Sequence, residues 1–380
     1  MEIQLTNNQK EFKEQFRRFA EEEIAPFAAE SDRNERLSEE IMGKIRRSGY
    51  LGSMISEEYG GKGWDPITLG LLNEEVGSVC SSTRAMFTVH GMVAIAIERF
   101  GTEEQKKTYL PLMTDGSMLG AFALSEPEAG SDAKRVKCQA EVKNDSFVIN
   151  GEKKWITMGQ AADLILVVVK LNNNPTVFLV EADTPGLDIV PMSGLMGNRA
   201  SMLAELHFKD CAIPKENMIG KEGMGLSHVA LNSLDYGRYT IAWGCVGLGQ
   251  ACLEKSFTYS GKRKQFGVSI NKNQLVQKML TEMIVEVKAA RRMCYYAGYL
   301  KQMNAAESIM ETWNAKYFAS KMGVSAADKA VQIHGGNGFI QNHDIERFYR
   351  DAKINEVIEG TSQIHEVLIA ANANMGWISS

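Results

Sequence analysis

One carboxylate in this 380-residue chain stands where it could act as a strong base. Glu359 is preceded by the apolar Val357 and Ile358 and followed by Gly360 and Thr361. Apolar surroundings raise the pKa of a carboxyl group, which makes its carboxylate a stronger base toward a weak carbon acid. The alternative is a surface glutamate in front of a helix cap, since most glutamates are exposed. Seen alone, the segment leaves both interpretations open.

Two segments could surround a planar, electron-poor ring. The first is the stretch 122–132 (FALSEPEAGSD), whose Pro/Gly turn could present backbone N–H groups and serine hydroxyls. The second is the stretch 153–157 (KKWIT), where a tryptophan beside a threonine could flank such a ring and hydrogen-bond its edge. An ordinary hairpin loop and a strand tryptophan in the core are the alternative interpretations.

Two further segments could hold phosphate groups or closely approach a ligand. In the stretch 263–267 (RKQFG), with Gln274 downstream, an arginine just before a helix could bind a pyrophosphate through its fork of donors. In the stretch 332–338 (QIHGGNG), three glycines in four positions allow close approach of the backbone. A solvated basic turn and a helix end followed by a turn are the alternatives. No strand precedes these glycines and they do not match G-x-G-x-x-G, so a Rossmann site is rejected.

These segments need a scaffold, and the hydrophobic period changes twice along the chain. Residues 1–120 are predicted to be helical, with apolar residues at positions 12, 16, 19 and 20 on one face and a helix start at Thr102. Residues 121–230 alternate as strands and turns, which predicts an antiparallel barrel or sandwich. Residues 231–380 return to the helical period, with an apolar stripe from Leu275 to Ala297 that predicts a helix bundle. The expected fold class is therefore α+β, mainly α.

Composition limits the partners and the compartment. A net charge of −5 argues against nucleic acid, because basic residues are not in excess. No run of 18 apolar residues exists, so no membrane span is expected, and the polar start at Met1 is not a secretory signal. The six cysteines lack any C-x-x-C pair and are expected to be reduced and buried in a cytoplasmic protein. The six histidines show no zinc-type spacing, so no metal site is expected.

In this order along one chain, the five segments resemble the acyl-CoA dehydrogenase family. The resemblance extends over nearly the whole chain, from the helix before the stretch 101–105 (GTEEQ) to the stretch 359–363 (EGTSQ). It implies an N-terminal helical domain, a central β domain and a C-terminal four-helix bundle, usually in a homotetramer, with FAD as the cofactor.

The resemblance also implies which residues contact FAD and substrate. Leu124 and Ser125 would contact the flavin ring, and Trp155 and Thr157 would cover its opposite side, with the Thr157 hydroxyl near N5 and O4. The implied FAD contacts are Phe122, Leu124, Ser125, Gly130, Ser131, Trp155, Thr157, Arg263, Gln265, Phe266, Gln274, Gln332, Gly335, Gly336, Thr361 and Gln363. Those between 263 and 336 would reach the FAD of a neighbouring subunit, which implies an obligate oligomer. The implied substrate contacts are Ser131, Asp235, Arg238 and Gly360.

The base of the family is a glutamate in one of two places, which here are Glu359 and Gly237. Only Glu359 offers a carboxylate. The resemblance implies that it removes the α-proton of an acyl thioester while the β-hydride moves to flavin N5. Hydrogen bonds to the thioester carbonyl, from an FAD ribityl hydroxyl and the Glu359 N–H, would each contribute about 3–4 kcal/mol.

One segment departs from the common family pattern. Where acyl-CoA enzymes often read Arg-x-Ser-x-Thr, the stretch 199–203 reads RASML and places Leu203 at the threonine position. Together with the stretch 238–245 (RYTIAWGC), this is more similar to the acyl-carrier-protein dehydrogenases of polyketide and nonribosomal peptide pathways. The expected function is therefore FAD-dependent α,β-dehydrogenation of an acyl group on a carrier protein, with electrons passing to a flavoprotein or to oxygen.

Three alternatives stay open. They are a catabolic short-chain acyl-CoA dehydrogenase, an acyl-thioester oxidase or flavin monooxygenase on the same fold, and a non-catalytic thioester-binding scaffold. The carboxylate at Glu359 argues against the scaffold.

Overall fold

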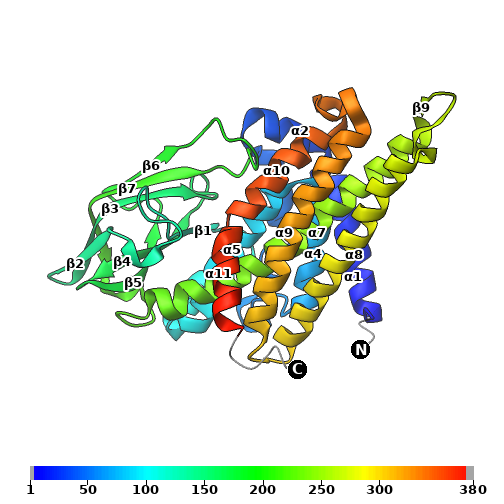
Figure 1. Cartoon of the computed structure of the whole chain (residues 1–380). Coiled ribbons are helices and arrows are strands. Elements are labelled where there is room, and N and C mark those ends of the chain that lie inside the picture. The colour runs from blue at the N-terminus through cyan, green and yellow to red at the C-terminus, as the bar shows by residue number, and fades with distance from the viewer. Residues whose placement is uncertain (1–3, 374–380) are drawn as a thin grey trace.

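The computed structural model describes residues 4–373, and its elements follow one another in three groups (Figure 1). The start at Met1 lies outside the described residues. The first group is helical and contains α1 (Asn7–Phe19), the π-helical turn η1 (Ala20–Ile24), α2 (Ala25–Asn34), α3 (Glu39–Ser48), the short 3₁₀ turn η2 (Glu57–Tyr59), α4 (Pro66–Val79), α5 (Ser81–Phe100) and α6 (Glu103–Thr114).

Local sequence signals explain these helices. The Thr102 hydroxyl accepts a hydrogen bond from the Gln105 N–H, and the Gln105 side chain accepts one from the Thr102 N–H. This reciprocal pair satisfies two backbone donors that would otherwise be free, so the predicted helix start is confirmed. On α1, Phe16 is fully buried and Phe12 and Phe19 pack against the same core, as their spacing predicted.

The second group forms one sheet with the strand order β6-β7-β3-β2-β4-β5-β8, and β1 lies beside β4. The strands are β1 (Gly120–Ala123), β2 (Gln139–Lys143), β3 (Ser146–Ile156), β4 (Leu164–Leu171), β5 (Asn174–Glu181), β6 (Leu187–Pro191), β7 (Ala204–Pro214) and β8 (Met218–Ile219). The prediction of a purely antiparallel arrangement was wrong, because β1 and β2 both run parallel to β4. A long loop rather than a hairpin joins β1 to β2, so both strands meet the same edge of β4 in the same direction.

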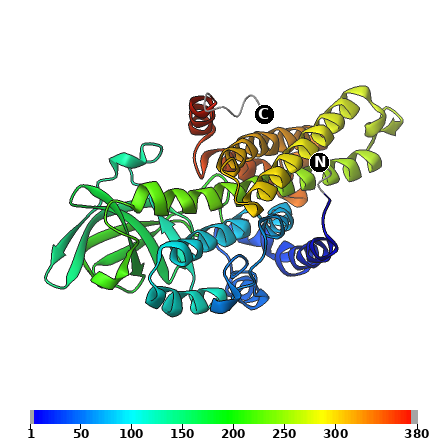
Figure 2. The ribbon, with the colours of Figure 1, turned by 90° about the horizontal axis from the view of Figure 1, so that it is seen from below.

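The third group is helical again and begins at Gly225, earlier than the predicted residue 231. It contains η5 (Gly225–Ala230), α7 (Leu231–Lys262), the hairpin strands β9 (Lys264–Gln265) and β10 (Val268–Ser269), α8 (Gln274–Gln302), α9 (Ser308–His334), α10 (Ile345–Val357) and α11 (Ser362–Asn372). Helices α7 to α10 pack together as a four-helix bundle. Figure 2 shows the sheet at one end of the molecule and the bundle at the other.

The apolar stripe of α8 is buried from Leu280 to Ala297, but Leu275 at its start is 77% exposed. Leu275 lies in the first turn of α8, next to the hairpin that projects at the far end of the bundle (Figure 1). The predicted apolar stripe is therefore buried only where other elements of the chain pack against α8.

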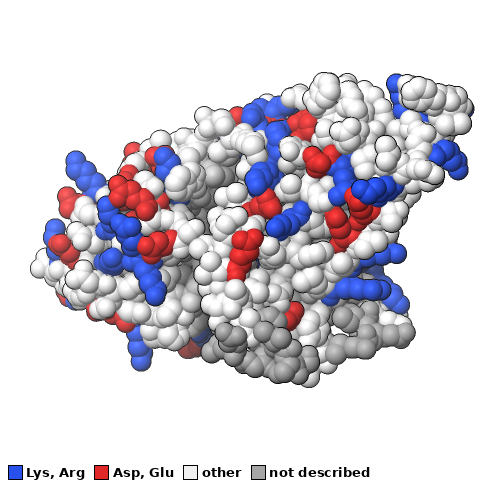
Figure 3. All heavy atoms as spheres, viewed as in Figure 1, with Lys and Arg blue, Asp and Glu red and all other residues white. Residues whose placement is uncertain are grey.

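Surface and thiol properties agree with the composition. All six cysteines are buried and have free thiols, as expected. Basic and acidic side chains are interspersed on the face shown in Figure 3. Within residues 4–373, no helix is both long and apolar enough to cross a membrane.

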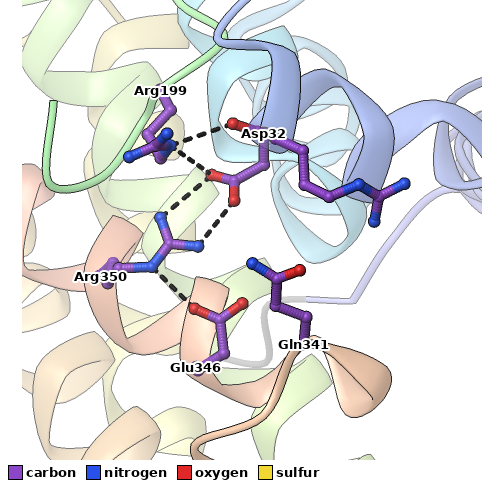
Figure 4. A pocket seen from close by; sticks show the side chains of 6 residues that line it. Asp32, Arg199, Gln341, Glu346 and Arg350 are labelled. Atoms are coloured by element: carbon purple, nitrogen blue, oxygen red, sulfur yellow. Dashed lines mark hydrogen bonds and ion pairs between the residues drawn. The ribbon is translucent and has the colours of Figure 1, made fainter. Parts of the chain in front are cut away.

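A cluster of ion pairs joins the three groups and fixes α10. The Asp32 carboxylate of α2 accepts hydrogen bonds from both terminal nitrogens of Arg350 on α10, at 3.1 and 2.7 Å. The Arg199 Nε donates to the Asp32 backbone carbonyl at 3.0 Å, and Figure 4 shows Asp32 between the two arginines. These residues line a small charged pocket with Arg33, Gln341 and Glu346. The cluster therefore anchors α10, the helix that leads to Glu359.

Candidate active site

Glu359 lies in the short connection between α10 and α11, and its backbone is unusual. The φ angles of Glu359 and Gly360 are 55° and 94°, both in the left-handed region. That conformation is free for glycine but costs a glutamate roughly 1–3 kcal/mol, and it persists only where neighbours hold it. The Thr361 hydroxyl then starts α11 by accepting a hydrogen bond from the Ile364 N–H at 3.3 Å.

The Glu359 carboxylate points into the protein. Its Oε2 atom is buried and has no hydrogen-bond partner among the described residues. Burial raises the pKa of Glu359 to about 7, although the nearby cations Arg238, Lys316 and Arg84 act to lower it. The interpretation as a surface glutamate is therefore wrong, and the side chain has the pKa of a base that works near neutral pH.

Gly237 on α7 faces this carboxylate directly. A Cβ atom at Gly237 would lie 2.6 Å from the Glu359 Oε2 and 2.8 Å from its Cδ, so any side chain there would displace the carboxylate from its observed position. The two sequence positions considered for the base therefore meet at one point in space. The glycine at 237 leaves the room that the carboxylate at 359 occupies.

Arg238, the residue after this glycine, binds the backbone of the connection between α10 and α11. Its Nε donates to the Glu359 carbonyl at 3.0 Å, and its guanidinium lies over the Trp313 ring at 5.9 Å. Asp235, one turn earlier, forms an ion pair with Lys301, while its buried Oδ1 has no hydrogen-bond partner in the described part of the chain. The structure thus brings Arg238, Gly360 and Glu359 together, and it gives Asp235 an ion-pair partner that the sequence did not indicate.

A buried ion pair holds the loop that follows β1. The Lys153 Nζ lies 2.8 Å from the Glu126 Oε1, with side chains only 0% and 5% exposed. The same ammonium donates to the Leu124 carbonyl at 3.0 Å, and the Lys154 N–H donates to the Ser125 carbonyl at 3.0 Å. The two segments predicted to surround a planar ring are therefore fastened to each other.

Trp155 is turned out of the sheet by an extra residue in β3. The pairing of β3 with β7 shifts between Lys153 and Ile156, and Trp155 has a φ of 60° and is 48% exposed. The interpretation as a core tryptophan is wrong, because the bulge directs the indole outward. Thr157, two residues after Trp155, is half-buried, while Gly130 and Ser131 are exposed in the turn after β1. Phe122 is partly buried where two of the hydrophobic cores meet.

The remaining predicted FAD contacts lie elsewhere. Arg263 directly follows α7, and α8 begins only at Gln274, so the expected position of this arginine just before a helix was wrong, while its contact with FAD stays a prediction. The β9–β10 hairpin places Gln265 beside Phe266, which is 99% exposed. Gln332, Gly335 and Gly336 are exposed where α9 ends in a turn, as the alternative interpretation expected. The exposed Gln363 lies in the first turn of α11, next to its cap. Within one chain, the hairpin lies at the far end of the bundle from β1 (Figure 1).

Sequence reasoning missed the buried cations around Glu359. Lys316 on α9 is fully buried, and Arg84 on α5 is 1% exposed and donates to Asn355 at 3.1 Å. A lysine on the same helical face as Thr312 and Ala319, both fully buried, was the available signal.

Fold and site together combine a carboxylate of raised pKa with an indole that a strand bulge exposes, and strongly shifted pKa values are typical of functional sites. Family models for the N-terminal, middle and C-terminal domains of acyl-CoA dehydrogenases match residues 6–117, 121–211 and 223–374. The chain belongs to the acyl-CoA dehydrogenase family. It is a flavin-dependent acyl-thioester dehydrogenase with FAD as its cofactor, which excludes the scaffold alternative.

Several relatives cover almost the whole chain. A probable acyl-CoA dehydrogenase of Bacillus subtilis, YngJ, is 39% identical over 97% of this chain and 99% of its own. The structure is similar to butyryl-CoA dehydrogenase from Megasphaera elsdenii, with a TM-score of 0.94 and 32% identity over 98% of this chain and all of the other. It is equally similar to the prolyl acyl carrier protein oxidase AnaB, with a TM-score of 0.94 and 30% identity over 98% of this chain and all of the other.

Removing the buried ammonium of Lys153 is expected to destabilise the protein. The Lys153→Met variant would leave the buried Glu126 without a countercharge, with only the backbone N–H groups of Lys137 and Cys138 as donors, and breaking a buried pair in this way typically costs about 3–5 kcal/mol. The Lys154→Met variant is the control, because its 2.7 Å ion pair with Glu205 is 29% and 28% exposed and is expected to contribute below about 1 kcal/mol. Chemical denaturation measures both, and equal losses would contradict the role given to the buried pair.

Replacing Glu359 by glutamine is expected to stabilise the protein at alkaline pH. Its folded pKa of about 7 lies above the ordinary value of 4.5, so the folded protein binds this proton more tightly than the unfolded chain. The ionised carboxylate therefore destabilises the fold by up to about 3 kcal/mol above pH 7, and this penalty disappears as the pH falls toward 4.5.

Thermal unfolding at pH 8 and pH 5 tests this expectation. Glu359→Gln should unfold at a higher temperature than the wild type at pH 8 and by a much smaller margin at pH 5. Glu356→Gln is the control, because that carboxylate pairs with Lys353 at 2.6 Å and should not stabilise the fold when removed. No gain at pH 8 for Glu359→Gln would mean that the carboxylate is not held in a desolvated site.

Proposed function

We propose that Glu359 removes the α-proton of an acyl thioester. The observation that carries this proposal is the buried, unpartnered Oε2 facing Gly237, with a pKa of about 7. A carboxylate with that pKa accepts a proton near neutral pH more readily than an ordinary glutamate. FAD, when bound, supplies the acceptor for the β-hydride. The residues of the chain then have to orient the thioester, stabilise the developing enolate and keep out water.

A backbone donor supports the enolate role. The Glu359 N–H makes no hydrogen bond within residues 4–373 and is free to donate to a thioester carbonyl. The Glu359 carbonyl is held by Arg238 on the other side of the connection. Such a preorganised donor stabilises developing negative charge by about 3–4 kcal/mol.

We further propose that FAD lies between subunits of a homotetramer in the cytoplasm. Leu124, Ser125, Trp155 and Thr157 would enclose the flavin ring, because the Lys153–Glu126 pair fastens both segments and the bulge exposes the indole. Arg263, Gln265, Phe266 and Gln274 would contact the FAD of a neighbouring subunit, as would Gln332, Gly335 and Gly336. Their exposure at the far end of the bundle supports this arrangement. Thr361 and Gln363 would hold the adenosine half, while Gly130 and Ser131 would lie beside the pyrophosphate or the substrate arm.

For the substrate, we propose an acyl group carried by an acyl carrier protein. Leu203 takes the place of a hydroxyl, and its carbonyl accepts from the Gln160 side chain at 2.6 Å at the start of β7. The similarity to AnaB, which is named as acting on a prolyl carrier protein, supports the same carrier class. Both carriers end in phosphopantetheine, so Glu359 and Arg238 would serve either substrate.

A catabolic short-chain acyl-CoA dehydrogenase is the second candidate, and the similarity to butyryl-CoA dehydrogenase favours it. The acceptor of the electrons would be a flavoprotein in a dehydrogenase and oxygen in an oxidase. Admitting air to the substrate-reduced enzyme separates these two, since only an oxidase regains its yellow colour rapidly.

Stopped-flow flavin reduction with one acyl group on three carriers tests the substrate proposal. We expect the carrier-protein thioester to give a kcat/KM at least about tenfold above the CoA thioester, which corresponds to about 1.4 kcal/mol of docking free energy. The matching pantetheine thioester is the control, because it lacks both the nucleotide and the protein surface. Equal or faster reduction by the CoA thioester would assign the chain to the catabolic enzymes.

A further inference from the structure

Lys316 is a fully buried cation directly behind the Glu359 connection. It lies on α9, its Nζ donates to the Gly360 carbonyl at 2.7 Å, and the Glu356 carbonyl lies 3.5 Å away. Among residues 4–373, no carboxylate lies within ion-pair distance of this ammonium, and its hydrogen bonds go to backbone carbonyls. Its nearest hydrogen-bonding partners are therefore two backbone carbonyls from the end of α10 and the connection.

Burying an ammonium group without a carboxylate beside it lowers the stability of the folded protein. Burial disfavours the charged form of lysine and lowers the pKa of Lys316 to about 8. A methionine of similar length would fill the same space without that cost. Packing alone therefore does not explain why this residue is a lysine. What a lysine adds at this position is a strong hydrogen-bond donor and a positive charge.

Lys316 and Arg238 together hold two successive peptide units. The Arg238 Nε from α7 donates to the Glu359 carbonyl at 3.0 Å, and the Lys316 Nζ from α9 donates to the Gly360 carbonyl at 2.7 Å. These are the two residues with left-handed backbone, at φ angles of 55° and 94°. A rotation of either peptide unit would break one of these hydrogen bonds and would swing the Glu359 side chain away from Gly237. Two helices thus fix the strained conformation that the sequence alone would not favour.

We propose that Lys316 is a positioning residue for Glu359: it clamps the Gly360 carbonyl and supplies a buried positive charge that favours the ionised carboxylate. The proposal rests on Glu359 being the base. Arg238 acts on the neighbouring carbonyl, so the two cations work as a pair and neither has to touch the substrate. The lysine thus offsets part of the cost of ionising a carboxylate in a desolvated site.

The test compares three substitutions on α9. Lys316→Met removes both the donor and the charge, Lys316→Gln keeps an N–H donor and removes the charge, and Lys321→Met is the control. Lys321 lies on the same helix but is exposed, and within residues 4–373 it donates only to the Tyr317 hydroxyl, at 3.2 Å. If Lys316→Met does not fold, Lys316→Gln decides the question, because its amide can still satisfy the Gly360 carbonyl.

Two readouts are needed, and the first does not depend on turnover. Infrared difference spectra between high and low pH report the protonated carboxyl band of Glu359, which is assigned by its loss in Glu359→Gln. We expect the pKa of Glu359 to rise by about one unit in both Lys316 variants and to stay unchanged in Lys321→Met. The other titratable and charged groups around Lys316 stay in place, so they do not account for such a shift: Arg84, Arg238, Cys245, Glu356 and His365.

The second readout is the pH profile of flavin reduction by the best thioester. The rise of the rate with pH should move to higher pH in both Lys316 variants. At a pH where Glu359 is ionised, Lys316→Met should be slower than wild type by about tenfold or more, and Lys316→Gln should lie between them. A wild-type profile and rate in a folded Lys316→Met, or a rate loss with an unchanged Glu359 pKa in the infrared titration, would overturn the proposal. If no thioester reduces the wild-type flavin, the proposed function fails, while the infrared titration still tests the electrostatic effect of Lys316.

Discussion

The structure of this site depends on keeping one carboxylate ionisable in a place that disfavours its charge. Burial raises the pKa of Glu359 to about 7, and the carboxylate Oε2 has no hydrogen-bond partner within residues 4–373. An ionised carboxylate without a partner is among the most expensive groups to bury. Cations on three helices reduce this cost without pairing with the carboxylate directly. They are Arg84 on α5, Arg238 on α7 and Lys316 on α9. A direct ion pair would lower the pKa and weaken the base. Arg238 and Lys316 instead donate to backbone carbonyls, and Arg84 donates to the side chains of Thr88 and Asn355, which preserves both ionisation and basicity.

The surrounding elements hold the connection between α10 and α11 in place from several sides. Arg350 on α10 is paired with Asp32 on α2, so the helix that leads to Glu359 is tied to the N-terminal helices. Gly237 on α7 leaves the space for the carboxylate, and the next residue, Arg238, holds the backbone. On the other side, the Lys153–Glu126 pair fastens the two segments of the β group that are proposed to enclose the flavin ring. Buried polar contacts between groups of elements, rather than apolar packing alone, therefore set the geometry of the site.

The features that could be predicted from the sequence are those that depend on residues close together in the chain. The order helical, β, helical followed from periodicity, and the helix start at Thr102 followed from the spacing of its capping partner. The sequence could not show that β1 and β2 run parallel to β4, because parallel pairing depends on where a long loop returns. It also could not show that Trp155 leaves the core, since a single extra residue in β3 reverses the direction of a side chain. Lys316 was missed for a related reason: a lysine in a helix is exposed by default, and only the tertiary structure shows which carbonyl it meets. The contact between Gly237 and Glu359 could not be predicted either, because these residues lie far apart in the chain.

The central claim is that the Glu359 carboxylate removes a proton from the α-carbon of an acyl thioester. The most direct measurement is the exchange of that proton with deuterium from D2O, using a 3-thia-acyl thioester whose sulfur replaces the β-carbon so that no hydride can leave. The wild-type enzyme should exchange the α-proton. The Glu359→Gln variant should retain FAD and exchange this proton about 10²–10⁴-fold more slowly. Exchange at a nearly wild-type rate in an FAD-containing Glu359→Gln variant would contradict the claim, because Gly237 provides no second carboxylate.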